Sequence, residues 1–237
     1  MACDIIQLMD CSIQQLNKFL TRWYQTFGID HVFYDLNSIK TKPKKQEISS
    51  EKQMNFSSLE DLKKAVLEID CILKKTARNT VFSDGDPKSD IMIIGEAPGQ
   101  EEDEQGKPFV GQSGKLLDNM LLSVGIKRSE VYISNIVFWR PPGNRTPSAE
   151  EVALCMPYVE AHISFIKPKV LLLLGSVAVK SLLNTSEGIS KLRGKKNIYK
   201  DIDVIPTFHP AYLLRSPGQK ALAFRDFISL KKLLNQN

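Results

Sequence analysis

The residues best suited to chemistry begin in an acidic, glycine-rich stretch at residues 91–114, IMIIGEAPGQEEDEQGKPFVGQSG. It starts as an apolar run and then carries five glycines, two prolines and five carboxylates. Such a loop after a buried strand lets the backbone come close to a ligand. Because the loop is acidic, unlike a phosphate cradle, it predicts a pocket for a neutral, flat group. Phe109 offers an aromatic face on which a base could stack, with ordinary core as the alternative.

Two further polar side chains, Asn135 and His209, lie near the ends of later apolar segments. The Asn135 amide presents a donor and an acceptor side by side, which matches the edge of a nucleobase; a buried turn partner is the alternative. His209 is one of three histidines, and a lone histidine is more often structural. Its place between a predicted strand and Pro210 favours a functional role. His31 and His162 receive no role.

The elements that must position these residues alternate between short apolar strands and helices. Strands are predicted over 90–94, 131–138, 170–174 and 204–207, and helices over 113–124, 149–166, 176–183 and 221–234. This alternation predicts an α/β fold, a three-layer α/β/α arrangement with a central, mainly parallel four-stranded sheet. Ligands bind beyond the carboxyl ends of such strands, so Asn135, His209 and the glycine-rich loop are expected at one rim.

Before the first strand, the chain divides into an extension and the start of the main domain. Residues 5–28 show helical spacing of apolar residues, and residues 36–57 are polar and lysine-rich, which is typical of a linker. Ser57 followed by Glu60 predicts a helix that begins there and runs to about Lys75. We therefore predict an N-terminal helical extension with a polar linker over 1–57 and one main domain over 58–237.

Composition and charge argue against a membrane protein and a disulfide-rich secreted protein. The 237 residues contain no apolar run near the roughly 20 residues of a membrane span, and no signal peptide is expected. Four cysteines without a CxxC pair favour a reducing cytoplasm. Residues 195–237 carry eight Lys or Arg against three Asp, whereas the rest of the chain is neutral. This basic end suits DNA, with a solubilising surface as the alternative.

Three motifs at the predicted strand ends together resemble a known family. GEAPGQEEDEQGKPFVGQSGKLLDNML, YISNIVFWRPPGNRTP and PTFHPAYLLR are similar to those of type-4 uracil-DNA glycosylases, and the resemblance covers about residues 58–237. It implies a monofunctional hydrolase that flips deoxyuridine out of DNA, cleaves the N1–C1′ bond and leaves an abasic site for base-excision repair. The implied partner is uracil-containing DNA, and we expect a monomer in the cytoplasm without a membrane partner.

The resemblance also implies roles for individual residues. His209 and the backbone amide of Glu96 would donate to uracil O2, where negative charge develops. Asn135 would bind the N3–H and O4 edge, and Phe109 would stack on the base. Glu96 or Glu102 would activate water and favour the cationic sugar. Three further contacts to the substrate are expected, at Ala97, Gly99 and Asp103.

The resemblance places DNA contacts after the last predicted strand. Leu213 or Leu214 would fill the gap left by the flipped base, although two adjacent leucines are commonly helix core. Tyr212 and Arg215 would support this wedge against backbone phosphate. Further phosphate contacts are expected from the proline-rich turn, at Arg140 and Arg145.

The chain departs from the family in its cysteines. Many type-4 enzymes hold a 4Fe-4S cluster with four cysteines, of which this chain keeps Cys71 and Cys155. Glu68 and Trp139 stand at the other two positions, and the spacing of the two N-terminal cysteines argues against their replacing them. We therefore expect no 4Fe-4S cluster and no other cofactor or metal, with Cys71 and Cys155 as buried thiols.

Three alternatives to uracil excision are weighed. A non-catalytic DNA-binding module of the same fold need not retain Glu96, Phe109, Asn135 and His209 together. A glycosylase of broader specificity for deaminated bases, such as xanthine or hypoxanthine, is disfavoured by Asn135. A third alternative is a covalent uracil-DNA trap, as found in one branch of the superfamily. That branch carries a basic, histidine-containing loop inserted near the second strand, whereas the corresponding WRPPGNRTP of this chain has neither a histidine nor an insertion.

Overall fold

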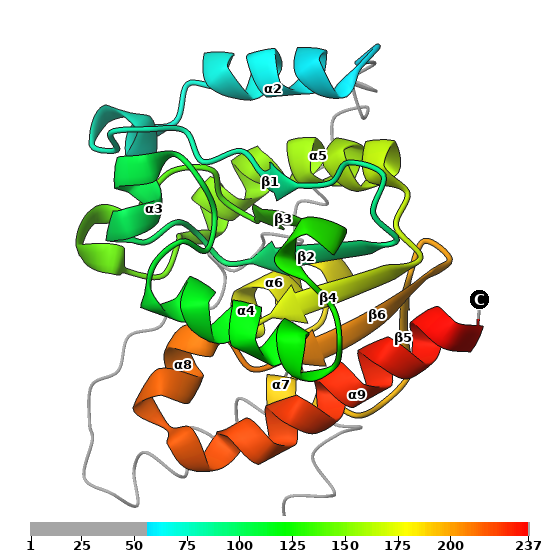
Figure 1. The fold of residues 1–237 in the computed structure, drawn as a ribbon. Coiled ribbons are helices and arrows are strands. Elements are labelled where there is room, and N and C mark those ends of the chain that lie inside the picture. The colour runs from blue at the N-terminus through cyan, green and yellow to red at the C-terminus, as the bar shows by residue number, and fades with distance from the viewer. Residues whose placement is uncertain (1–55, 237) are drawn as a thin grey trace, which may run out of the picture. The chain divides into compact units, whose positions relative to one another are not determined.

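The computed structural model describes residues 56–236, which form a six-stranded sheet in the order β1-β3-β2-β4-β6-β5 (Figure 1). The inner strands β3, β2, β4 and β6 are parallel, and the edge strands β1 and β5 pair antiparallel with their neighbours. The strands are β1 Asp84–Gly85, β2 Ile91–Gly95, β3 Tyr132–Asn135, β4 Val170–Leu174, β5 Asn197–Tyr199 and β6 Ile202–Thr207. The predicted parallel core is confirmed, but the predicted count of four strands is wrong because both edge strands were missed.

Both missed strands lack the usual sequence signals. β1 has two residues, Asp84 and Gly85, which is too short for an alternating pattern. β5 turns into β6 through Lys200 and Asp201, both in the left-handed region at φ 43° and 68°. A two-residue turn of this kind is normally signalled by Asn-Gly or Asp-Gly, and neither dipeptide occurs here.

Helices cover both faces of the sheet. They are α2 Leu59–Glu68, α3 Gln100–Gln105, α4 Gln112–Ser123, α5 Ala149–Ile166, α6 Ser176–Leu183, α7 Ile189–Leu192, α8 Pro210–Arg215 and α9 Lys220–Gln236. Short 3₁₀ helices lie at η2 Ile72–Lys75, η3 Arg128–Glu130, η4 Pro142–Asn144 and η5 Pro217–Gln219. Within the described residues, no helix is long and apolar enough to cross a membrane.

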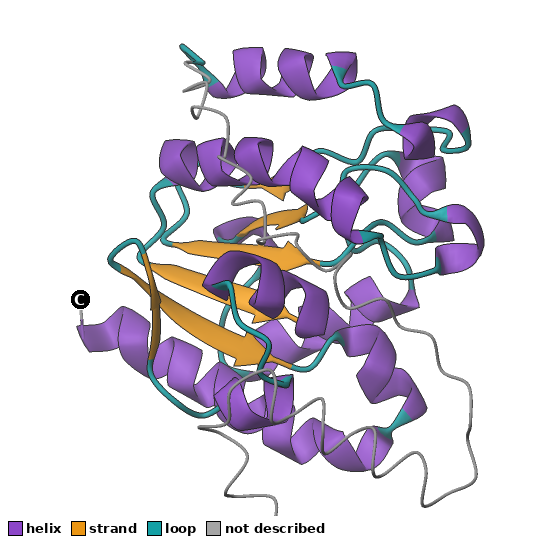
Figure 2. Cartoon of the chain, turned by 180° about the vertical axis from the view of Figure 1, so that it is seen from behind, coloured by secondary structure: helices purple, strands orange, loops and turns teal. Residues whose placement is uncertain are grey.

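Successive residues of the central strand β2 face opposite layers, as the pleat requires. Met92 and Ile94 belong to the cluster with α2, α5 and α6, whereas Ile91 and Ile93 belong to the cluster with α4 and α9. Figure 1 shows α4 and α9 on one side of the sheet, and the view from behind in Figure 2 shows the helices of the other side. A strand buried on both faces explains the unbroken apolar run that identified it in the sequence.

The first described helix differs from its prediction at both ends. Its N-cap is Ser58, whose hydroxyl accepts from the Asp61 amide at 3.1 Å, so the predicted cap at Ser57 is wrong by one residue. The helix ends at Glu68 rather than Lys75. The following residues alternate between buried and exposed, with Ile69, Cys71 and Leu73 inside, and this period of two does not suit an α-helix. Only a short 3₁₀ helix, η2, forms there, over Ile72–Lys75.

Two other predictions also need comment. The predicted strand 131–138 stops pairing regularly at Asn135, although the next two amides still donate to the carbonyls of Gly95 and Glu96. The predicted helix over 5–28 and nearly all of the predicted linker over 36–57 lie outside the described residues.

The topology creates a crevice at the carboxyl edge of the sheet. The chain leaves β2 toward α4 on one face, and it leaves β4 toward α6 on the opposite face. Between β2 and β4, therefore, adjacent connections diverge, which is where open α/β sheets bind ligands.

Candidate active site

A cavity of about 630 Å³ opens at this crevice, and the segments after β2, β3, β4 and β6 line it. Ten of the residues proposed from the sequence contribute to its wall: Glu96, Ala97, Gly99, Glu102, Phe109, Asn135, Arg145, His209, Tyr212 and Arg215. Four others do not: Asp103, Arg140, Leu213 and Leu214. The expectation that Asn135, His209 and the glycine-rich loop meet at one rim is confirmed.

Phe109 and Asn135 approach each other across Gly95, the last residue of β2. A Cβ atom on Gly95 would lie 2.5 Å from Asn135 Oδ1 and 2.6 Å from Phe109 Cζ. Real Cβ atoms do not approach other atoms so closely, so only glycine leaves room for both side chains. Phe109 is itself in the left-handed region at φ 52°, an unusual conformation for a bulky residue.

Asn135 lines the cavity and carries an amide oxygen that has no partner in the described part of the chain. Its side chain is 1% exposed, and its Oδ1 has no hydrogen-bond partner among the described residues. Buried amide oxygens are nearly always paired, because leaving one unsatisfied costs about 1–3 kcal/mol. Because the oxygen is itself buried, an N–H donor in the cavity would reach it only after a small rotation of the amide.

The tautomer of His209 follows from its position at the start of α8. Its Nδ1 accepts from the Ala211 amide at 3.1 Å, so the hydrogen of the neutral ring is on Nε2. Burial lowers the pKa of His209 to about 4, and the positive charge of Arg215 adds to the effect. Near neutral pH this side chain is therefore an uncharged N–H donor. Gly175, at φ 89°, lies close beneath it, with a hypothetical Cβ at 3.1 Å from that of His209.

Glu96 lines the cavity, and its carboxyl group has a shifted pKa. Burial raises its pKa above the ordinary 4.5, and a hydrogen bond with the Thr146 side chain offsets part of the increase. A partly buried carboxylate of this kind is suited to positioning water or stabilising a nearby cation.

Glu102 and Asp103 have other partners, on the short helix α3 that was not predicted. Glu102 accepts from the amides of Gly99 at 3.1 Å, Val110 at 3.0 Å and Gly111 at 2.9 Å. Its carboxylate thus closes the glycine-rich loop on itself.

Asp103 points away from the cavity. Its Oδ1 accepts from the amides of Arg78 and Asn79 at 2.8 and 3.1 Å, and its side chain is nearly fully buried. The structure thus ties Asp103 to the segment before β1 rather than placing it on the cavity wall.

The two candidate wedge leucines occupy different environments on α8. Leu213 is fully buried and packs with Phe208 and Ala223, whereas Leu214 is 42% exposed. Tyr212 is also exposed and stacks at a tilt on Phe208, with ring centroids 5.3 Å apart. Of the two leucines, only Leu214 has an exposed side chain.

The proline-rich turn after β3 carries a residue that the sequence analysis did not assign. Asn144 lines the cavity at φ 56° and accepts from Arg140 Nε at 2.7 Å. The motif Pro-Pro-Gly-Asn could have indicated a tight turn with Asn144 in the left-handed region, since asparagine tolerates that region in turns. Arg145 makes a two-fold ion pair with Glu151, at 2.6 and 2.8 Å, which fixes the turn to α5.

Among the described residues, the surroundings of Cys71 contain one further cysteine, Cys155, and not the four cysteines of a four-iron cluster. Cys71 and Cys155 are buried and free, Glu68 is exposed, and Trp139 is 1% exposed with its Nε1 donating to Thr80 at 2.9 Å. Within the described residues, no three His, Cys, Asp or Glu side chains gather to hold a metal ion. Burial is the main cause that raises the pKa of Cys155 to about 12, which favours the thiol over the thiolate that metals bind.

The fold and the cavity define a class: an α/β protein with a pocket at the carboxyl edge of its parallel sheet, lined by Phe109, Asn135 and His209 and bordered by the exposed end of α8. A sequence profile of the Uracil DNA glycosylase superfamily matches residues 82–230. A type-4 uracil-DNA glycosylase from Sulfurisphaera tokodaii is 39% identical to this chain, over 75% of this chain and 86% of the relative. One from Archaeoglobus fulgidus is 38% identical, over 75% of this chain and 94% of the relative. The enzyme from Thermotoga maritima is 43% identical over 62% of this chain and 77% of its own. The chain belongs to the uracil-DNA glycosylase superfamily, and within it to the type-4 enzymes.

Proposed function

We propose that this type-4 uracil-DNA glycosylase hydrolyses the N-glycosidic bond of deoxyuridine in DNA within the cavity described above. The observation that carries the assignment is the unsatisfied Oδ1 of Asn135, buried beside Phe109. The N3–H of uracil matches this acceptor, and the Asn135 NH₂ group is suited to uracil O4. Cytosine has no hydrogen on N3 and carries a donor at C4, so it would leave the amide mismatched.

The reaction proceeds with charge separation that the remaining wall residues are suited to stabilise. As the N1–C1′ bond breaks, the electron pair moves onto the uracil ring and positive charge develops on the sugar. His209 Nε2–H and the Glu96 amide donate to uracil O2, so they act where the negative charge grows. A neutral donor suffices for this role, which agrees with the lowered pKa of His209.

Glu96 acts on the opposite side of the bond. Its carboxylate favours the cationic sugar and orients the water whose oxygen adds to C1′, while the proton of that water passes to the carboxylate. Glu102 holds the loop through three backbone amides, so it is assigned a structural part.

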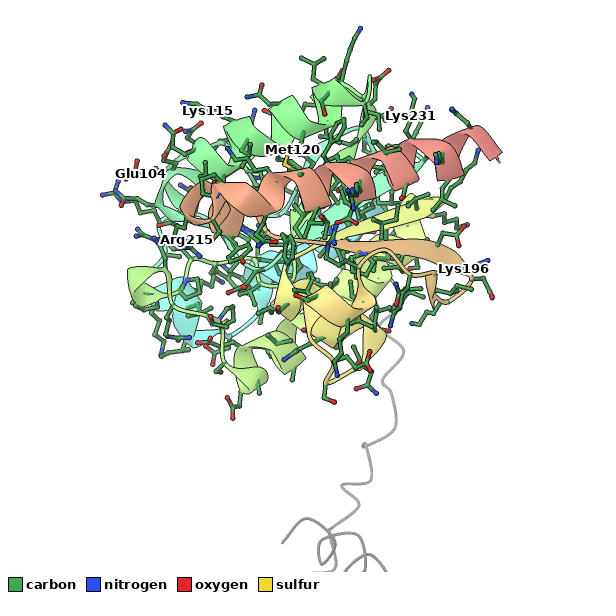
Figure 3. The ribbon with its side chains drawn as sticks, turned by 90° about the horizontal axis from the view of Figure 1, so that it is seen from below. Glu104, Lys115, Met120, Lys196, Arg215 and Lys231 are labelled. Atoms are coloured by element: carbon green, nitrogen blue, oxygen red, sulfur yellow. The ribbon has the colours of Figure 1, made fainter. Side chains whose placement is uncertain are left out.

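DNA approaches from the side of α8. Leu214 enters the stack where the uridine leaves, and Arg215 with Tyr212 contacts the backbone around it. Figure 3 labels Arg215 and, on the neighbouring helix α4, Lys115, whose side chains are exposed; Lys231 lies toward the far end of α9. Such cations give an affinity for phosphate that falls with added salt.

The protein performs this reaction without a 4Fe-4S cluster. The free thiols of Cys71 and Cys155 and the buried Trp139 support this proposal, because four thiolates are needed. Free buried thiols also fit a protein of the reducing cytoplasm, where we expect it to act as a monomer.

The test is strand scission of single- and double-stranded oligonucleotides that carry one uracil, followed by alkaline cleavage of abasic sites. Matched oligonucleotides with cytosine, thymine or hypoxanthine are the controls. We expect uracil to be the preferred base, and Asn135→Ala to lower kcat/KM on uracil by about 10²-fold or more, since a buried hydrogen-bonding group is lost. A wild-type protein silent on uracil would overturn the proposed function, and equal cleavage of hypoxanthine would overturn the proposed base preference.

A further inference from the structure

The conformation of Phe109 requires support from outside the cavity. Phe109 lies at φ 52°, in a region that costs a bulky residue about 1–3 kcal/mol. Such a conformation persists only when the surrounding residues enforce it. One neighbour is the backbone of α4, because a Cβ on Gly114 would lie 1.9 Å from the Phe109 carbonyl oxygen. This packing restricts the loop from one side only.

Arg128 supplies the support from the other side. Its Nη1 donates to the carbonyl oxygen of Phe109 at 2.9 Å, and its Nη2 donates to that of Pro108 at 2.8 Å. These two carbonyls belong to the peptide planes before and after the Phe109 Cα atom. Holding both planes restrains φ and ψ of Phe109 together, and with them the direction of its ring.

Two carboxylates orient the guanidinium itself. Asp84 Oδ2 accepts from Nε at 3.2 Å and from Nη2 at 2.9 Å, and Asp118 Oδ1 accepts from Nη1 at 3.0 Å. All five N–H groups of Arg128 are thereby used, on β1, α4 and the glycine-rich loop. The planar fork of arginine allows this arrangement, whereas the single ammonium of lysine does not.

We propose that Arg128 is a positioning residue for uracil excision, because it holds Phe109 in the strained conformation that presents its ring to the flipped base. Arg128 does not line the cavity, so it acts through Phe109 and not on the substrate. The inference rests on the proposed stacking of uracil on Phe109. The position of Arg128 in the sequence, in the polar segment before β3, gave no indication of a link to the site.

The first experiment compares Arg128→Gln and Arg128→Lys with the wild type in single-turnover excision. We expect both variants to lose about 10- to 100-fold in the rate at saturating enzyme, the size expected when a reacting group is misplaced. Affinity for an undamaged duplex should stay within about twofold, since phosphate contacts are elsewhere. Full rescue by lysine would show that only a positive charge is needed and would overturn the proposal.

The second experiment is a double-mutant cycle with Phe109→Ala. If Arg128 acts through the Phe109 ring, Arg128→Gln should cost almost nothing further in a Phe109→Ala background. A fully additive loss would overturn the proposal. Lys169→Gln is the control, because it removes an ion pair with Asp90 at 3.3 Å at the opposite end of the sheet.

The two experiments separate this inference from the function on which it rests. An inactive wild type contradicts the proposed function, whereas an active wild type with an equally active Arg128→Gln contradicts only the role of Arg128. If Arg128→Gln unfolds below the assay temperature, the same cycle with Asp118→Asn replaces it. That variant keeps both carbonyl hydrogen bonds but loosens the guanidinium, so an intermediate, ring-dependent loss is expected.

Discussion

The ring of Phe109 and the imidazole of His209 lie 5.6 Å apart, centroid to centroid, at an interplanar angle of 33°. Phe109 comes from the loop after β2 and His209 from the segment after β6, two strands that are not neighbours in the sheet. In the proposed function, a base stacked on Phe109 would have its edge near the His209 Nε2–H. The proposed recognition of the ring face and the proposed stabilisation of the leaving group would thus take place in one narrow space.

This narrow space makes Gly95 a sensitive position. In Gly95→Ala the new methyl would lie 2.5 Å from Asn135 Oδ1 and 2.6 Å from Phe109 Cζ, so one of these side chains must move. Displacement of about 1 Å can cost about 10²-fold in rate, and we expect a loss of that size in kcat/KM on a single-uracil oligonucleotide. Gly188→Ala, which meets nothing within 4 Å, is the matched control. Equal activity of the two variants would refute the proposed contact.

The parallel core and its ligand edge were predictable from the sequence, because strands buried on both faces are continuous apolar runs. Ile91–Gly95 and Val170–Leu174 show this directly. The edge strand Asn197–Tyr199 was not predictable, since its turn uses Lys200 and Asp201 where glycine is usual. Short edge strands bury little surface and so leave little pattern.

Within the site, residue types predicted which side chains would meet, but not how each would be used. Asn135 and His209 were singled out because they lie at the carboxyl ends of predicted parallel strands, where open α/β sheets bind ligands. Glu96 and Glu102 could not be separated, since the difference lies in three backbone amides that reach Glu102 through the loop. Leu213 and Leu214 likewise differ only through the rotation of α8.

The pH dependence of excision should report Glu96 and not His209. Burial raises the pKa of Glu96 above 4.5 and lowers that of His209 to about 4. As the pH falls, the Glu96 carboxylate is therefore protonated first, while His209 remains a neutral donor. We expect one acid limb in kcat, from Glu96 and at a pH above 4.5, and no second limb from His209.

Two variants test this assignment of the acid limb. Glu96→Gln should leave a weak residual rate that is independent of pH down to about 5, whereas His209→Gln should lower the rate but keep the limb. A limb near pH 6.5 that disappears in His209→Gln would show that the Nδ1 hydrogen bond from Ala211 does not hold the neutral ring.

The adjacent leucines of α8 should give opposite results when each is replaced by alanine. Leu213→Ala opens a cavity among Phe208 and Ala223 and should lower the free energy of unfolding by about 2–5 kcal/mol. Leu214→Ala should leave stability nearly unchanged but slow excision from duplex DNA more than from single strands, because only a duplex leaves a gap to fill. Denaturant unfolding and parallel rate measurements check both. Loss of duplex activity in a fully stable Leu213→Ala, with Leu214→Ala normal, would reverse the assignment.

The surroundings of Trp139 predict how the purified protein responds to metal removal. Trp139 is 1% exposed, packs edge-on against Phe138 with centroids 6.1 Å apart, and donates to Thr80, so it occupies its space as an apolar core residue does. We expect less than one iron per chain by elemental analysis and a melting temperature unchanged by an iron chelator. Trp139→Ala should instead cost about 3–5 kcal/mol of stability, as for other buried large-to-small substitutions. Stoichiometric iron and sulfide, or unfolding by the chelator, would show that Cys71 and Cys155 recruit further ligands and that a cluster contributes to the fold.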